Sequence, residues 1–116
     1  MSEVTIYHNP GCSKSRQTLA LLEANGVTPT IVLYLENPPD ATELRHILAL
    51  LKLTPSDLLR TRESEYEALD LGNPARSDDE LIAAMVANPI LIERPIVVKG
   101  SRAAIGRPPE QVLEIL

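Results

Sequence analysis

Residues 5–19 of the chain read Thr5-Ile6-Tyr7-His8-Asn9-Pro10-Gly11-Cys12-Ser13-Lys14-Ser15-Arg16-Gln17-Thr18-Leu19. A β-prone run opens this stretch, Asn-Pro-Gly marks a turn, and the residues from Ser13 onward favour a helix. The chain's single cysteine, Cys12, therefore lies where a strand gives way to a helix. Such a thiol faces the backbone N–H groups and the positive dipole end of the helix, which favour the thiolate. We predict that Cys12 is a reactive nucleophile.

The alternative for a lone cysteine is a buried structural role as a small hydrophobic residue. The sequence around Cys12 favours the reactive interpretation, because its neighbours are Gly11 and Ser13 rather than apolar residues. Lys14 and Arg16 follow within one helical turn, and His8 adds positive charge when it is protonated. Cations of this kind lower the pKa of a thiol.

Length and composition restrict the class of protein. A chain of 116 residues suits one domain over residues 1–116. One cysteine allows no internal disulfide, and neither a membrane-spanning run nor a secretory signal is present, so we expect a cytoplasmic protein without membrane association. The net charge of −5 disfavours nucleic-acid binding. One cysteine and two separated histidines suggest no metal site.

The whole sequence predicts the order strand, helix, strand, several helices, two strands as a hairpin, and a last helix. We expect strands at 4–7, 30–35, 96–99 and 103–105, the second of them buried because it is β-branched and apolar. Helices are expected at 13–24, 41–52, 54–59, 65–69 and 77–87, and a last one opens at 108–110. A β-α-β unit followed by a hairpin favours an α/β fold with a mixed sheet covered by helices.

Several segments are typical of one family when taken together. They are Ile6-Tyr7-His8-Asn9-Pro10 before Cys12 with Ser15-Arg16 after it, residues 33–39, Leu58-Leu59-Arg60, residues 88–98, Gly106-Arg107-Pro108 and Val112-Leu113. Over nearly its whole length the chain resembles the glutaredoxin-linked, ArsC-type arsenate reductases. The resemblance implies a thioredoxin-like (glutaredoxin-like) fold, with a four-stranded mixed sheet, a helical insertion between the strand pairs and a cis-proline at Pro95.

The resemblance also implies an enzyme of arsenic detoxification that reduces arsenate to arsenite. Cys12 would be the nucleophile, with glutathione as co-substrate, a glutaredoxin as electron donor and no bound cofactor. Carried over residue by residue, His8 and Ser15 would stabilise the thiolate, and Arg60, Arg94 and Arg107 would hold the oxyanion. Guanidinium groups suit this task, because they donate paired hydrogen bonds and keep their charge. We expect a monomer.

The single cysteine shapes the expected mechanism. An adduct on Cys12 has no second protein thiol to resolve it, so an external thiol must do so. Ser15 stands where Cys-x-x-Cys proteins carry the resolving cysteine, and its hydroxyl can instead donate a hydrogen bond to the thiolate.

Other interpretations stay open from the sequence alone. His8 and Ser15 suit a strand end and a helix cap, Arg60 can pair with Glu63 or Asp57, and Arg94 with Glu93. Two other functions are compatible with the chain. One is an Spx-like regulator that binds RNA polymerase, a related group that often has Cys-x-x-Cys at this site. The other is a glutathione-dependent thiol oxidoreductase that does not act on arsenate. Better-known reductases continue past the position of Leu116 with a charged tail, so the physiological substrate stays open.

Overall fold

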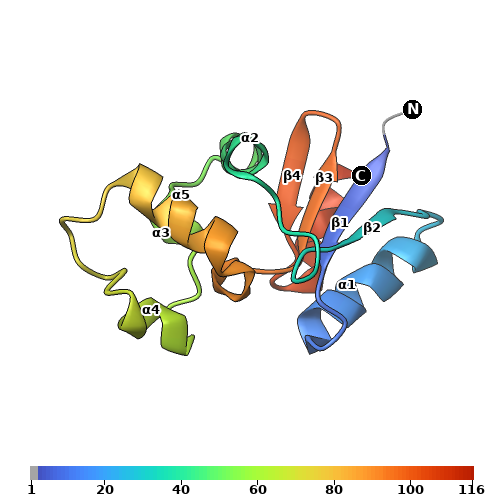
Figure 1. The fold of residues 1–116 in the computed structure, drawn as a ribbon. Coiled ribbons are helices and arrows are strands. Elements are labelled where there is room, and N and C mark those ends of the chain that lie inside the picture. The colour runs from blue at the N-terminus through green and yellow to red at the C-terminus, as the bar shows by residue number, and fades with distance from the viewer. Residues whose placement is uncertain (1–2) are drawn as a thin grey trace. The chain divides into compact units, whose positions relative to one another are not determined.

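The computed structural model describes residues 3–116, which form two compact units (Figure 1). The sheet unit contains the described residues 3–37 together with Arg94–Leu116, and the insertion unit contains Pro38–Glu93. The second unit is thus inserted in the sequence between the two halves of the first, as the predicted helical insertion requires. The expectation of a single domain stays a prediction.

A mixed four-stranded sheet forms the centre of the sheet unit (Figure 1). Its strands are β1 (Val4–His8), β2 (Thr30–Leu33), β3 (Ile96–Lys99) and β4 (Arg102–Ile105), in the order β2-β1-β3-β4. β1 pairs in parallel with β2, whereas the β1–β3 and β3–β4 pairs are antiparallel. The predicted mixed sheet and its terminal hairpin are therefore confirmed.

The second strand differs from its prediction. It ends at Leu33 rather than at residue 35, because the chain turns there: the N–H groups of Glu36 and Asn37 both donate to the Leu33 carbonyl. β2 is also an edge strand, and Ile31 is 48% exposed. The expectation of a buried strand was wrong, because an apolar β-branched run fits an edge strand as well as a central one.

Two helices cover one face of the sheet. α1 (Ser13–Ala24) packs there through Leu22, and the 3₁₀ helix η2 (Pro109–Ile115) packs through Val112. Both side chains are fully buried against Ile6 of β1 and Val97 of β3. Burying an aliphatic side chain of this size contributes about 1.5–3 kcal/mol, so this core fixes α1, and the residues at its N-terminus, against the sheet.

The insertion unit is helical. Its elements are α2 (Ala41–Leu51), α3 (Pro55–Leu58), α4 (Ser64–Ala68), α5 (Asp78–Ala87) and the 3₁₀ turn η1 (Pro89–Leu91). Capping boxes start α3 at Thr54 and α5 at Ser77, where the sequence predicted the starts of two helices. Within the described residues no helix is both long and apolar enough to cross a bilayer.

Candidate functional site

Three chain segments meet at one end of the sheet because of its topology. The last residues of β1 pair with the first residues of β3, through Tyr7 and Ile96. The first residue of β3 pairs in turn with the last residue of β4, Ile105. The segment after β1, the segment before β3 and the segment after β4 therefore lie side by side. These segments carry Cys12, Arg94 and Arg107 respectively.

Cys12 lies at the N-cap of α1, in an extended backbone conformation. The turn before it is held by two hydrogen bonds: the Cys12 N–H donates to the Asn9 carbonyl at 3.0 Å, and the Gly11 N–H donates to Asn9 Oδ1 at 2.9 Å. The thiol is partly exposed. The predicted position of the cysteine at a strand-to-helix junction is confirmed, and a ligand from solvent can reach it.

The surroundings of Cys12 favour the thiolate. Burial on its own raises the pKa of the Cys12 thiol, because it penalises the charged form. Hydrogen bonds from the Ser15 N–H, the Arg94 side chain and the Lys14 N–H oppose this effect, and the charge of Arg94 adds to them. The net result is a pKa below the ordinary value of a cysteine.

Two guanidinium groups flank the sulfur. Arg94 is 9% exposed, and its side chain donates a hydrogen bond to Cys12. Arg107 lies 3.5 Å from the sulfur through Nη2, while its Nε donates to the Arg94 carbonyl at 2.7 Å. The structure therefore brings together Cys12, Arg94 and Arg107. The Arg94–Pro95 peptide bond is cis, as predicted, and the Arg107–Pro108 bond is also cis.

His8 and Ser15 form a buried pair beside the nucleophile. His8 Nδ1 and Ser15 Oγ share a hydrogen bond of 2.6 Å, and the Asn9 N–H donates to the same hydroxyl oxygen at 3.0 Å. Burial lowers the pKa of His8, and the charge of Arg16 lowers it further. The imidazole is therefore neutral at neutral pH, so the positive charge that the sequence suggested for His8 is absent there.

The neutral His8 ring allows two proton arrangements. If Nδ1 carries the proton, the imidazole donates to Ser15 and the serine hydroxyl hydrogen can serve the thiolate. If Nε2 carries it, Ser15 donates to Nδ1, and only the Ser15 backbone N–H acts on Cys12. Thiolate stabilisation by the His8 and Ser15 side chains stays a prediction.

Arg60 belongs to the insertion unit. An antiparallel bridge between Leu59 and Ile92 holds its backbone, and the Arg60 N–H donates to the Leu91 carbonyl at 2.8 Å. Its side chain pairs with Glu63 at 3.1 Å, as one interpretation predicted, and with Glu93 at 2.6 Å. A role for Arg60 in binding the oxyanion stays a prediction.

Two contributors to the site were not in the predicted set. Asn9 was interpreted as a turn residue, yet its carbonyl, amide oxygen and N–H hold the loop and Ser15 together. Lys14 acts through its backbone N–H rather than through its charge. An Asn-Pro-Gly turn directly before a helix was the available signal, because Asn side chains bond to the backbone two residues ahead.

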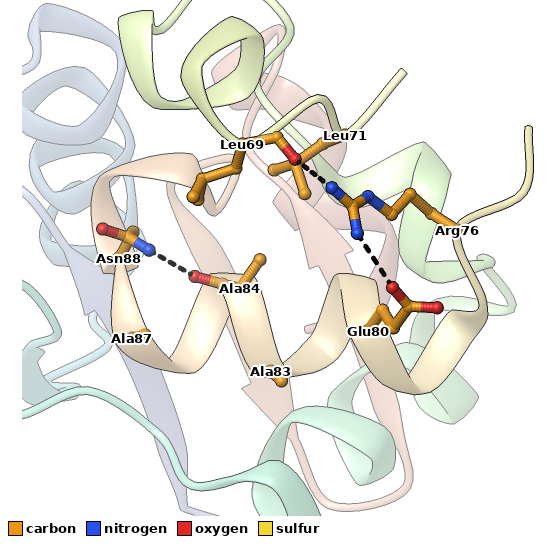
Figure 2. Close-up of a pocket in the computed structure, with 8 residues that line it drawn as sticks. All are labelled: Leu69, Leu71, Arg76, Glu80, Ala83, Ala84, Ala87 and Asn88. Atoms are coloured by element: carbon orange, nitrogen blue, oxygen red, sulfur yellow. Dashed lines mark hydrogen bonds and ion pairs between the residues drawn. The ribbon is translucent and has the colours of Figure 1, made fainter. Parts of the chain in front are cut away.

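A hollow in the insertion unit is a second feature of the surface (Figure 2). Its volume is about 380 Å³, and α5 lines it with Ala83, Ala84 and Ala87. Arg76 at its rim donates to Glu80 at 3.0 Å and to the Leu69 carbonyl at 2.8 Å. This hollow contains no nucleophile among the residues that line it. Over residues 3–116 no cluster of His, Cys, Asp and Glu side chains is suited to a metal ion.

Comparison with known proteins gives consistent matches. The model of the ArsC family matches residues 7–115. An Escherichia coli protein named uncharacterized protein YfgD is 56% identical, over 98% of this chain and 97% of its own. The arsenate reductase of Haemophilus influenzae is 50% identical, over 97% and 98% respectively. The solved structure of an arsenate reductase from Vibrio cholerae superposes with a TM-score of 0.97 at 52% identity, over 99% of this chain and 98% of its own. The predicted thioredoxin-like fold is thereby confirmed.

Proposed function

Because the chain belongs to the ArsC family, we propose that it is an oxidoreductase that reduces arsenate to arsenite through Cys12. The observation that carries this proposal is a thiol at a helix N-terminus that receives hydrogen bonds from two arginines. Relatives named arsenate reductase, such as that of Haemophilus influenzae, support it.

The charges at the site suit a tetrahedral oxyanion. Arg94 and Arg107 approach the sulfur from two different loops, so they can neutralise an anion while it lies against Cys12. Without them, repulsion between the thiolate and a dianion would oppose the attack. The same donors stabilise the charge that develops on oxygen as one oxygen leaves.

The first step forms a bond between the Cys12 sulfur and arsenic. The thiolate attacks arsenic(V), and one arsenate oxygen leaves as water after taking two protons. The arginines hold the remaining oxygens in this adduct. Arsenic keeps its oxidation state, so the protein serves here as a covalent nucleophile.

The second step transfers the electrons and needs an external thiol, for which we propose glutathione. Its thiolate attacks the Cys12 sulfur, a disulfide bond forms, and the sulfur–arsenic bond breaks with its electron pair passing to arsenic. Arsenite leaves as arsenic(III), and the two sulfurs together have lost two electrons. A glutaredoxin then reduces the mixed disulfide by thiol exchange. A cytoplasmic location would provide these reduced thiols.

The test is arsenate-dependent NADPH oxidation coupled through glutathione, a glutaredoxin and glutathione reductase. We expect turnover by the native chain and none by Cys12→Ser. Ser13→Ala is the matched control, because Ser13 is an exposed neighbour at the same helix start. Full arsenate turnover by Cys12→Ser would refute the proposal.

Two further assays on the same samples separate the alternatives. Reduction of a glutathione mixed disulfide without reduction of arsenate would identify a thiol oxidoreductase instead. Capture of the RNA polymerase α subunit, again without arsenate turnover, would identify a regulator. Arg60→Gln tests the remaining arginine: we expect it to raise the KM for arsenate if Arg60 holds the anion.

A further inference from the structure

Gly106 lies at the point where the three segments of the site touch. It directly precedes Arg107, and it is buried. Its N–H donates to the Pro95 carbonyl at 2.9 Å, and its own carbonyl lies 3.5 Å from the hydroxyl of Thr18, a fully buried residue of α1. One residue thus contacts both α1, whose N-cap is Cys12, and the segment that carries Arg94.

The contacts of Gly106 leave no space for a side chain. A methyl group on its Cα would overlap the Thr18 hydroxyl oxygen, and it would lie 2.8 Å from Pro95 Cγ and 3.0 Å from Thr18 Cγ2. Carbon atoms pack best at roughly 3.5–4.0 Å, so such a group would displace the loop by about 0.7 Å or more. The glycine is required here by close approach of neighbouring atoms, since its φ lies outside the left-handed region.

We infer that the contact between Gly106 and Thr18 is a positioning device that sets the distance between the Arg107 guanidinium and the Cys12 sulfur. Arg107 is an exposed side chain, so its polar contacts and its backbone contribute to its position. Its guanidinium is located by the Nε bond to the Arg94 carbonyl and by the backbone that Gly106 anchors against α1. The Nη2–sulfur distance of 3.5 Å is ordinary for a hydrogen bond to the large sulfur atom, and a displacement of this size away from the sulfur would break the contact.

Gly106 and Thr18 are thus positioning residues that act through Arg107. The effect that we expect on arsenate binding rests on the proposed function, whereas the effect that we expect on the Cys12 thiolate does not. The hydrogen of the Thr18 hydroxyl is shared between the Lys14 carbonyl, one turn earlier in α1 at 2.8 Å, and the more distant Gly106 carbonyl. The Thr18 side chain therefore links the first turn of the helix, where the thiolate is held, to the loop that carries the arginine.

The test is a double-mutant cycle of Gly106→Ala and Arg107→Ala. Its direct readout is the rate of iodoacetamide alkylation of the thiolate against pH, and its second readout is protection from alkylation by arsenate. We expect Gly106→Ala to weaken arsenate protection by at least about threefold and to raise the apparent pKa of Cys12. In the Arg107→Ala background we expect Gly106→Ala to change neither quantity.

Three other variants make the test specific. Gly26→Ala strains the backbone at φ 77 at the far end of the same helix, so it should lower stability without changing either readout. Gly106→Ala with Thr18→Ala removes the two Thr18 overlaps and should recover part of the protection. Thr18→Val replaces the hydroxyl that faces the Gly106 carbonyl by a methyl group of similar shape. It should act in the same direction as Gly106→Ala, and it keeps the test open if Gly106→Ala does not fold.

An equal effect of Gly106→Ala with and without Arg107 would overturn the inference, as would no effect of either Gly106→Ala or Thr18→Val. The proposed function fails in a different way. If the native chain does not reduce arsenate, the proposed arsenate reductase activity is refuted. The alkylation cycle would still show whether Gly106 acts through Arg107.

Discussion

Removal of the Arg94 side chain should make Cys12 a weaker nucleophile near neutral pH. Arg94 donates a hydrogen bond to the thiolate and is itself buried. A hydrogen bond to a charged group contributes about 1.5–3 kcal/mol, and the partial exposure of Cys12 favours the lower end of this range. About 1.4 kcal/mol corresponds to about one pKa unit. We therefore expect Arg94→Ala to raise the pKa of Cys12 by about one unit.

The sign follows from which form Arg94 stabilises. It binds the thiolate, so its removal favours the protonated thiol and the pKa rises. Below both pKa values the thiolate fraction should fall about tenfold, and the alkylation rate should fall with it. The ultraviolet absorbance of the thiolate during a pH titration measures the pKa directly. Since the chain has a single cysteine, the thiolate signal comes from Cys12, and the same titration of Cys12→Ser corrects for the absorbance of the three tyrosines at high pH.

Arg16→Ala is the matched control for Arg94→Ala. Arg16 lies in the first turn of α1, close to Cys12 in the sequence, but its guanidinium donates to the Pro10 carbonyl at 2.8 Å rather than to the sulfur. Its removal should shift the pKa of Cys12 far less. Arg94→Lys keeps the charge without the planar guanidinium and should give an intermediate value. Equal shifts for Arg16→Ala and Arg94→Ala would show that general positive charge, and not the Arg94 contact, holds the thiolate.

Two predictions concern stability. The pKa of His8 is lowered in the folded chain, so the neutral imidazole contributes to the free energy of unfolding. This contribution is fully present above the unfolded pKa of 6.5, and it is lost as the pH falls through the folded pKa. His8→Gln should therefore flatten the acid side of the curve of unfolding free energy against pH, and an unchanged slope there would contradict this account. Ser77→Ala removes the hydroxyl that accepts from the Glu80 N–H at 3.1 Å and should cost about 1 kcal/mol in urea unfolding. Ser64→Ala, at a serine that caps no helix, should cost clearly less; equal losses would show that the cap is not the cause.

Local signals in the sequence were sufficient for the helix boundaries. The helix expected at 77–87 follows from Ser77 with Glu80 three residues later, which start α5, and the helix expected at 13–24 follows from Asn25-Gly26, which end α1. These signals depend on hydrogen bonds within a few residues, so they do not require knowledge of the tertiary structure. The burial of β2 was mispredicted for the opposite reason. Whether residues 30–33 form an edge depends on which strands pair, and no local pattern records this.

The approach of the two arginines to Cys12 could not be predicted from local sequence patterns either. Arg94 and Arg107 lie 82 and 95 positions after Cys12, and each can form a surface ion pair as readily as an active-site contact. Only the family resemblance selected them. In the structure the register supplies the physical reason, because Tyr7 pairs with Ile96 and Ile96 with Ile105. A shift of this register by one residue would turn the strand side chains to the opposite face and displace both arginines along the sheet.

The thiolate therefore depends on the sheet as much as on its immediate neighbours. Hydrogen bonds from the Ser15 and Lys14 N–H groups come with the helix, and any cysteine at this N-cap would receive them. The arginine contacts require in addition that the end of β1, the start of β3 and the end of β4 lie side by side. They also require that the loop after β4 approach α1 closely, which Gly106 allows. Loss of the helix hydrogen bonds would raise the pKa of Cys12 but leave the two arginines in place to hold an oxyanion. Loss of the arginine contacts would also weaken the nucleophile, and in addition it would remove the affinity for an oxyanion, so substrate protection measured together with the alkylation rate distinguishes these two defects.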